Sequence, residues 1–486
     1  MIHAKGSFAT TVPVFVLSAY YLGSAFQIAR RTFWTRGLGD WIDPYFINFL
    51  LEHWYRSLST FTDPSSPPMF APIRGTLGYS HGLVLYAPFY FVLRPFFHPF
   101  QSYGLMLFVV LEIGVVSLYL VLRLAFRLSF VEALLLSAFF LTSRNVLSGL
   151  MGVWSQRGSV FLIPPILLLV FVSQRTSAAG PRAVLASLSG LLSTLLFTFA
   201  VGATAGALIF MWLSLPARRE HPAFSEDQVI RELVSRGSFH WRRPVDLIRS
   251  LGAYDSVRTF TFVFVSAVLT WIPAFKADKT ARRLMLWLLV FSLVVLVIPI
   301  RFGDFSIWTT VFRPLPGLDA VRDPKRIIYL YELAAVLAAG LFLTRMPRNS
   351  GLRVSAALLL FVLLIAEPNR VVFDFLRPNE TYDRWVEAPI EADPACRSFF
   401  IARASQAYGR RLNADWTMYD IDSMFVALNH SIPTLNGYSA WTPEGWRLSN
   451  PSDPDYESEV ARWIERYDLR GVCELDIERR TMRPRP

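Results

Sequence analysis

The chain has 486 residues, a net charge of +11 and a hydrophobic content of 53%, above the roughly 45–50% usual for soluble proteins. The excess lies in long apolar runs, so most of the chain is predicted to be embedded in a membrane. Residues 1–367 carry 33 basic and 18 acidic residues, whereas residues 368–486 carry 15 and 19. The positive charge lies between apolar runs, so anionic membrane lipids are the expected partners and nucleic acid is not.

Motifs of four common enzyme classes are missing from the sequence. It contains no P-loop, no GxGxxG after a strand, no HExxH and no GxSxG. This argues against an ATPase, a dehydrogenase, a zinc protease and an α/β-hydrolase. The seven histidines do not form ligand pairs, so no metal site is predicted from them.

The first apolar run covers residues 8–28. It is longer than the core of a usual signal peptide, and Arg30 and Arg31 follow it where a small-residue cleavage site would stand, so an uncleaved helix is predicted. The run 183–215 is too long for one span and is read as two helices. We therefore predict a polytopic α-helical membrane domain over residues 1–367, with about eleven transmembrane helices. The apolar runs are 8–28, 83–97, 105–122, 131–141, 160–172, 183–215, 260–275, 284–300, 327–343 and 354–366.

A polar loop, residues 30–81, follows the first run and concentrates acids, arginines and aromatic residues. Such a cluster at the edge of a membrane domain, on a loop held by a rigid scaffold, is a candidate for chemistry. A solvated connector is the alternative, although aromatic side chains would be costly in a loop that touched only water. The candidate residues are Asp40, Asp43, Arg74, Tyr79 and His81.

A second polar loop, residues 301–326, brings Arg322, Lys325 and Arg326 to the start of a predicted helix. Guanidinium forks suit phosphate oxygens. Pairing of these cations with Asp319 and Asp323, or with lipid headgroups, is the alternative.

The tail, residues 368–486, is predicted to be a small soluble α/β domain. Its strands are expected where short apolar stretches occur, and its helices where apolar residues recur at helical spacing. The predicted elements are strands at 397–402 and 471–477, helices at 422–428 and 455–467, and a turn at 435–438.

Cys396 and Cys473 are the only cysteines, and each lies at or within a predicted strand of the tail. If these strands are neighbours, the two Cα atoms reach the ~4.4–6.8 Å that a disulfide needs. We predict that they pair and that the tail lies in an oxidising compartment, the periplasm or the cell exterior. An odd helix count also places the tail opposite the N-terminus. Two buried free thiols are the alternative.

Several segments together resemble the GT-C superfamily of membrane glycosyltransferases, which use lipid-linked sugars, and within it a group of bacterial enzymes. The resemblance covers most of the chain with loose motifs. Better-known members often carry adjacent acids in the first loop, whereas here the acids are three residues apart. The matching segments are GDWIDP at 39–44, LGYSH at 77–81, GLDAVRDPKR at 317–326, PTLNGYSAWTP at 433–443 and GVCELD at 471–476.

The resemblance implies an inverting transfer of sugar from a polyprenyl-phosphate donor to a cell-envelope acceptor, at the bacterial inner membrane. An acceptor hydroxyl then needs a general base, for which Asp40 is the best candidate, with Asp43 assisting or binding sugar hydroxyls. Arginines would stabilise the leaving phosphate, and aromatic rings would stack on sugar, unless they only anchor the membrane interface. The expected substrate-binding residues are Arg74, Tyr79, His81, Arg322 and Arg326, and the stacking candidates are Trp41, Trp54 and Tyr79.

Three questions stay open at this point. A divalent metal joining Asp40 and Asp43 is neither predicted nor excluded. A transporter or flippase for a lipid-linked or anionic substrate is the second hypothesis, and it predicts a charged pathway at mid-membrane. A non-catalytic membrane scaffold, whose loop and tail bind a partner protein, is the third.

Overall fold

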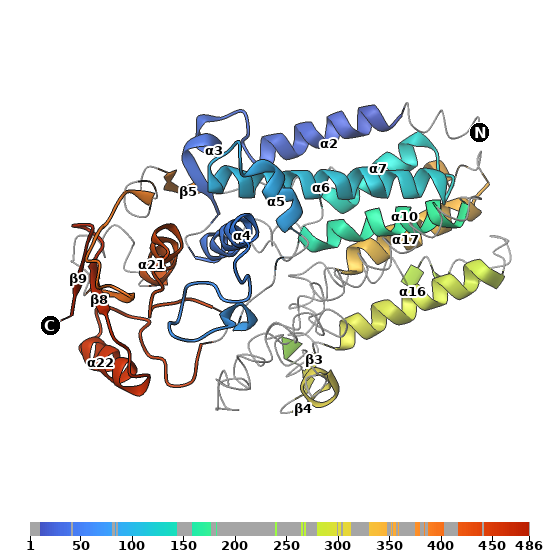
Figure 1. Cartoon of the computed structure of the whole chain (residues 1–486). Coiled ribbons are helices and arrows are strands. Elements are labelled where there is room, and N and C mark those ends of the chain that lie inside the picture. Colours follow the sequence, from blue (N-terminus) through green and yellow to red (C-terminus); the bar gives the residue numbers. More distant parts are fainter. Residues whose placement is uncertain are drawn as a thin grey trace. The chain divides into compact units, whose positions relative to one another are not determined.

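The computed structural model describes most of the polar loop and of the tail, together with part of the apolar helices (Figure 1). Its residues fall in two compact units, which we call the apolar unit (Met1–Ala29, Leu107–Gly206 and Ile230–Phe373) and the loop–tail unit (Arg30–Met106, Ala207–Val229 and Asp374–Pro486). The described residues are 10–39, 42–79, 83, 86–142, 158–175, 181, 239–240, 264–265, 267–268, 279–298, 300–302, 305–312, 330–347, 351, 353–355, 358, 375–379, 383, 387–402, 417–439 and 442–485.

The apolar unit is mainly helical, and its longer helices run in roughly the same direction in Figure 1. Strand β3 pairs in parallel with β2 and antiparallel with β4. The described elements are α2 (Thr11–Ala25), the larger part of α6 (Pro99–Leu124), α7 (Phe130–Leu141), η2 (Ser159–Leu162), α10 (Ile163–Arg175), β2 (Phe239–His240), α16 (Lys279–Val297), β3 (Ile300–Phe302), β4 (Phe305–Ser306), η4 (Trp308–Phe312) and α17 (Leu330–Arg345).

Small side chains hold α16 and α17 together. Ala281 and Met285 of α16 form one buried cluster with Ala335 and Ala338 of α17. Alanines let two helix backbones approach closely, which is the usual way in which helices pack in an apolar surrounding. The core of this unit therefore depends on close backbone contact.

Helix α7 begins with a capping box at Ser129. The Ser129 side chain accepts a hydrogen bond from the backbone of Glu132, and the Glu132 carboxylate accepts one from the backbone of Ser129. Arg353 then donates to the same carboxylate through Nη2 at 2.7 Å. This acid, which stands inside an apolar run of the sequence, is thus fully paired at a helix end.

Two described helices are long and apolar enough to cross a membrane: α6 with 26 residues and α16 with 19. Helix α16 turns apolar side chains outward, and Trp287 and Leu286 are 70% and 47% exposed. Exposed apolar surface of this kind fits contact with lipid better than with water. The two helices indicate that the chain associates with a membrane.

The prediction of about eleven transmembrane helices is wrong, because only α6 and α16 among the described helices have the length. At 1.5 Å per residue, the 12 residues of α7 span about 18 Å, against ~30 Å of hydrocarbon. Apolar composition alone did not reveal where each helix stops: α5 (Ala87–Leu93) has 7 residues, because Pro88 and Pro95 frame it. The predicted runs 183–215, 260–275 and 354–366 lie wholly or largely outside the described residues.

The loop–tail unit joins the tail with the polar loop, which was predicted to belong to the membrane domain. Strand β1 of the loop pairs antiparallel with β5 of the tail. The described elements are α3 (Arg31–Thr35), β1 (Arg36–Leu38), α4 (Asp43–Thr60), η1 (Thr76–Tyr79), α5, the first turns of α6, β5 (Phe375–Pro378), β6 (Glu391–Ala392), β7 (Ser398–Ile401), α21 (Thr417–His430), α22 (Tyr456–Arg466), β8 (Val472–Asp476) and β9 (Thr481–Pro484).

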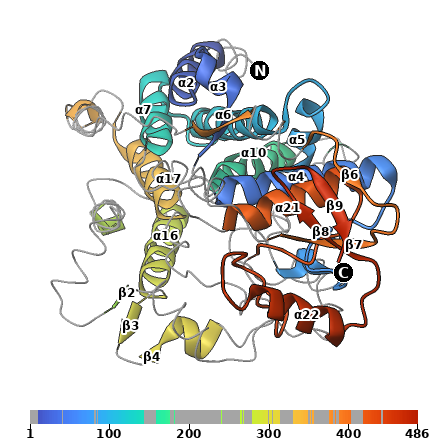
Figure 2. The same cartoon turned by 90° about the vertical axis from the view of Figure 1, so that its left-hand side faces the viewer.

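The tail contains a four-stranded sheet in the order β6-β9-β8-β7, visible in Figure 2. Strands β7 and β8 are parallel neighbours, and they correspond to the two predicted strands. Cys396 precedes β7 and Cys473 lies in β8, with a Cα–Cα distance of 5.6 Å, and the two form a disulfide. The pairing expected from neighbouring strands is present in the structure.

The helices of the tail follow the predicted pattern with one correction. Helix α22 buries Tyr456, Val460 and Trp463 at helical spacing, as predicted. Helix α21 begins at Thr417, five residues before the predicted start at Asp422, and the Asp422 side chain is fully buried inside the helix. The sequence pattern placed the start too late because a buried acid in a helix looks like a capping residue.

Backbone hydrogen bonds continue from β7 into the polar loop. The N–H of Phe399 donates to the carbonyl of Pro433 at 3.0 Å, and that of Leu435 donates to Phe399 at 2.7 Å. On the other side of this segment, Ala71 donates to Thr434 at 2.9 Å. The tail and the loop therefore share one hydrogen-bonded layer, and this layer positions the site described next.

Candidate functional site

Asp43 begins α4, with Pro44 directly after it. Proline is favoured in the first helical turn, and a carboxylate there is stabilised by the positive end of the helix dipole. The Asp43 side chain is partly exposed, and its Oδ1 accepts a hydrogen bond from the hydroxyl of Tyr438 at 3.1 Å. A predicted catalytic acid of the loop is thus held by a residue of the tail.

Tyr438 is itself fixed on both sides. Its ring packs edge-on against Phe46 of α4, with ring centroids 5.1 Å apart. The preceding Gly437 lies so close to the ring of Phe70 that an added Cβ would be 2.5 Å from a ring carbon. Only glycine fits there, so the Asn-Gly segment at 435–438 can bring the tail into contact with the loop. This segment bends at Leu435 and is irregular after it, and does not form the predicted turn.

Asn436 anchors the segment 435–438 in the interior of the tail. Its side chain accepts from the N–H of Ile401 at 2.9 Å and donates to the hydroxyl of Tyr456 at 3.0 Å and to the carboxyl of Asp420 at 3.2 Å. Burial raises the pKa of Asp420 well above its usual range. The segment that carries Tyr438 is therefore held by a fully buried polar cluster.

Tyr79 is fully buried, and its ring lies 6.2 Å from that of Phe70. It offers no exposed face on which a sugar could stack. Its backbone carbonyl accepts a hydrogen bond from the hydroxyl of Ser439 at 2.7 Å. Tyr79 thus supports the Tyr438 segment through its backbone, whereas the resemblance suggested a direct contact with substrate.

The other predicted site residues are placed only in part. Arg74 is exposed on the loop, as a phosphate-binding cation would need to be. Trp54 is only 9% exposed and is packed into the unit, so it offers little ring surface. Asp40, Trp41, His81, Arg322 and Arg326 lie outside the described residues.

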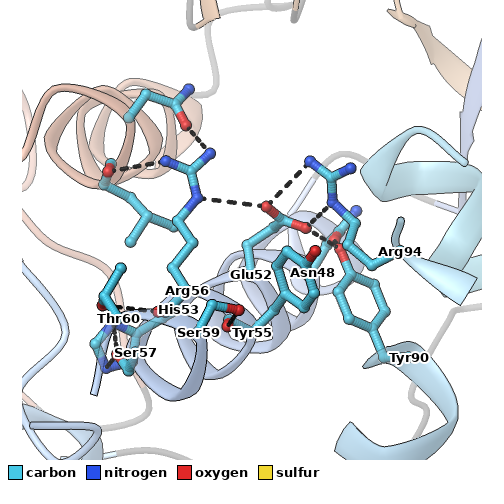
Figure 3. A network of polar contacts seen from close by, with 12 residues as sticks. Asn48, Glu52, His53, Tyr55, Arg56, Ser57, Ser59, Thr60, Tyr90 and Arg94 are labelled. Carbon is cyan, nitrogen blue, oxygen red and sulfur yellow. Dashed lines mark hydrogen bonds and ion pairs between the residues drawn. The ribbon is translucent and has the colours of Figure 1, made fainter. Parts of the chain in front are cut away.

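A second polar cluster on α4 was not predicted. Glu52 has no exposed surface, and its carboxylate is contacted by Tyr90, Arg94 and Arg56 (Figure 3). Arg94 reaches both carboxylate oxygens, with Nη2 at 3.4 Å from Oε2, and Arg56 Nε lies at 3.6 Å. The Tyr90 hydroxyl also lies 3.0 Å from the amide oxygen of Asn48.

The same two arginines connect α4 with other segments. Arg56 donates to the carbonyl of Leu428 at 3.1 Å and to the side chain of Asn429, both in the last turn of α21. Arg94 donates to the carbonyl of Phe97 at 3.2 Å. Because every partner is a protein group, this cluster holds α4, α5 and α21 together and leaves little of the Glu52 charge for a substrate.

His53 lies beside this cluster and is 4% exposed. Its Nε2 is 3.0 Å from the carbonyl of Pro64, to which a neutral imidazole can donate. Burial lowers the pKa of His53 to about 4, although the Pro64 carbonyl and Asp63 act in the opposite direction. His53 is therefore neutral at pH 7 and closes the loop onto α4.

One set of side chains among the described residues could hold a metal. The donor atoms of His98, Asp383 and Glu387 all lie within 4.8 Å of one another. These residues are distinct from Asp40 and Asp43, for which the sequence neither predicted nor excluded a metal. The sequence signal was weak, since His98 is 285 positions away from Asp383.

The comparisons with known proteins add no name to this geometry. No protein-family model matches the chain, and no curated protein sequence matches it. The interpretation of the site therefore depends on its residues and on their chemistry.

Proposed function

We propose that the protein is a membrane-associated glycosyltransferase that moves a sugar from a polyprenyl-phosphate donor to a cell-envelope acceptor. The observation that carries this proposal is the Asp43 carboxylate, partly exposed at the start of α4 and oriented by Tyr438 of the tail. A fixed, accessible carboxylate is the group that binding a sugar hydroxyl requires, and Asp40 stands three residues before it.

In the proposed reaction, Asp40 removes the proton of the acceptor hydroxyl while the oxygen of that hydroxyl bonds to the anomeric carbon of the sugar. The bond from that carbon to the lipid phosphate breaks, and the phosphate leaves with the electron pair. Asp43 holds the sugar through a hydroxyl, using the carboxylate oxygen that Tyr438 does not contact. Arg74, which is exposed on the same loop, stabilises the charge on the leaving phosphate.

The proposed location is the bacterial inner membrane, with the tail on the periplasmic or exterior side. Two observations support it: α6 and α16 are long and apolar enough to span, and Cys396 is disulfide-bonded to Cys473. Disulfides persist in oxidising compartments and are rare in the cytosol. Thiol labelling of the unfolded protein from intact cells tests the location: no labelling without reductant is expected, whereas two free thiols would contradict it.

The activity is tested by incubating purified full-length protein with radiolabelled polyprenyl-phosphate sugars and a cell-envelope extract. Asp40→Asn is expected to lower turnover by roughly 10²–10⁴-fold, the usual range for a lost acid–base group. Asp43→Asn is expected to lower it by roughly 10–10²-fold, the equivalent of one charged hydrogen bond to substrate.

Asp468→Asn provides the matched control. Its carboxylate is 87% exposed and lies in the tail, and asparagine tolerates the positive φ of 45° at this position. Turnover of this variant should equal that of the wild type. Normal transfer by the Asp40 and Asp43 variants would exclude the proposed mechanism.

A further inference from the structure

His98, Asp383 and Glu387 form a cluster outside the Asp43 site. His98 Nε2 lies 3.0 Å from Asp383 Oδ1, and one donor atom from each of the three residues lies within 4.8 Å of the other two. Asp383 and Glu387 are four residues apart in the chain, and the N–H of Ala388 donates to the carbonyl of Asp383 at 2.9 Å. Both carboxylates have an oxygen near the His98 ring nitrogen.

The scaffold around the cluster is built from contacts distant in sequence. Gln101, in the first turn of α6, accepts a hydrogen bond from Asn379 at 2.9 Å and donates to the carbonyl of Phe33 at 2.7 Å. Strand β5, which ends next to Asn379, pairs with β1. Gln101 follows His98 by three residues, and Asn379 precedes Asp383 by four. The hydrogen bond between them therefore links the two segments that carry the cluster.

The His98 ring is held in place, because it packs edge-on against Phe100 with centroids 5.1 Å apart. The histidine side chain is 20% exposed and that of Asp383 is 50% exposed, so the cluster opens to solvent.

We propose that His98, Asp383 and Glu387 bind a divalent transition-metal ion, with zinc as the best match. Zinc takes imidazole nitrogen and carboxylate oxygen at about 2.0–2.2 Å, so its ligand atoms lie roughly 3.2–3.5 Å apart in a tetrahedral site. The observed separations need only rotation of the exposed carboxylates to reach that geometry. Magnesium fits less well, because it prefers oxygen ligands in a near-ideal octahedron.

Three protein ligands leave one position of a tetrahedral ion open. Sites of this type keep that position for water or for a substrate oxygen, unlike structural zinc sites with four protein ligands. The ion would also join the segment before α6 to the tail, which are 285 residues apart in sequence. This inference does not depend on glycosyl transfer, and binding of the ion can be measured directly.

The test uses full-length protein in detergent, without a histidine tag and stripped of metal with a chelator. Titration with Co²⁺ is followed by visible absorption, and Zn²⁺ affinity by competition with a chromophoric chelator. We expect one ion per chain, absorption bands typical of four-coordinate cobalt, and displacement by Zn²⁺ but not by equal Mg²⁺. His98→Gln, Asp383→Asn and Glu387→Gln should each weaken Zn²⁺ binding by roughly 100-fold. This is the largest loss usual when only a hydrogen-bond partner of a ligand is removed, and these variants remove a ligand itself.

Glu391→Gln is the matched control, because it removes one exposed carboxylate four residues after Glu387 and should leave the affinity unchanged. Asp383 and Glu387 are exposed, so their variants should fold even if the His98 variant does not. Absence of stoichiometric binding would overturn the proposal. Equal affinity in the Asp383, Glu387 and Glu391 variants would do the same, because it would show adventitious binding only.

Discussion

The first turn and the middle of α4 carry acids in opposite situations. Asp43, at the first turn, is partly exposed and is held through one oxygen by Tyr438. Glu52, nine positions later, is fully buried and contacts one tyrosine and two arginines. A carboxylate whose partners are all protein groups stabilises the fold, whereas one with an accessible oxygen can receive a substrate. The concentration of charge in the polar loop therefore contains two different objects: a closed cluster and an open site.

The largest effect is expected for Glu52→Ala, which tests whether the closed cluster stabilises the fold. Removing one partner of a buried ion pair leaves the other charge uncompensated, which costs about 3–5 kcal/mol. We expect the free energy of unfolding to fall by about 4 kcal/mol, because Arg94 and Arg56 both lose their acid. Chemical denaturation of the purified protein in detergent, followed by fluorescence, measures the change.

Two further variants make this measurement specific. Glu52→Gln keeps the shape and an acceptor for Tyr90, so it should recover part of the stability. Asp468→Asn removes one charge of an exposed ion pair, keeps a residue that tolerates the positive φ of 45°, and should cost less than about 1 kcal/mol. A loss of stability no larger in Glu52→Ala than in Asp468→Asn would show that the cluster is not structural.

The second test uses pH, because His53 directly follows Glu52 in the closed middle part of α4. The pKa of His53 is about 4 in the folded protein and near 6.5 in the unfolded chain. Between these values the unfolded state binds more protons, so the contribution of neutral His53 is fully present above pH 6.5 and is lost as the pH falls through 4. The loss amounts to about 3 kcal/mol.

His53→Gln isolates this contribution from other acid effects. The variant should lose about 3 kcal/mol less than the wild type when the free energy of unfolding is compared at pH 7 and pH 4. Parallel pH curves for the two proteins would mean that His53 is not buried neutral.

Patterns that depend on near neighbours were predictable from the sequence. The strands β7 and β8, helix α22 and the pairing of Cys396 with Cys473 follow from short apolar stretches, helical spacing and strand ends. These features depend on a few adjacent residues, and so the sequence contains enough information to place them.

Features that depend on distant partners were not predictable. Glu52 and Asp43 look alike in sequence, and only the arrival of Arg94 and Tyr90 from α5 and its C-terminal end makes one of them structural. The prediction of membrane-spanning helices failed for a related reason. An apolar run indicates that a segment is buried, but it does not indicate whether lipid or protein surrounds it. The packing of the polar loop with the tail, through Thr434 and Ala71, left no local signal.

The finest test of the comparison is Tyr438→Phe at the open end. The change removes only the hydroxyl that donates to Asp43 at 3.1 Å, and the ring keeps its contact with Phe46. A hydrogen bond of this kind contributes about 1 kcal/mol, so stability should change by that amount or less, and turnover should fall by roughly 5–10-fold. If Tyr438 acts by orienting Asp43, the double variant Tyr438→Phe with Asp43→Asn should be no slower than Asp43→Asn alone. If the two losses multiply, Tyr438 acts on the substrate independently. Phe46→Leu disturbs the ring packing but leaves the Tyr438 hydroxyl in place. This variant should lower the free energy of unfolding by more than Tyr438→Phe does, and should lower turnover by less, which separates a loss of packing from a loss of orientation.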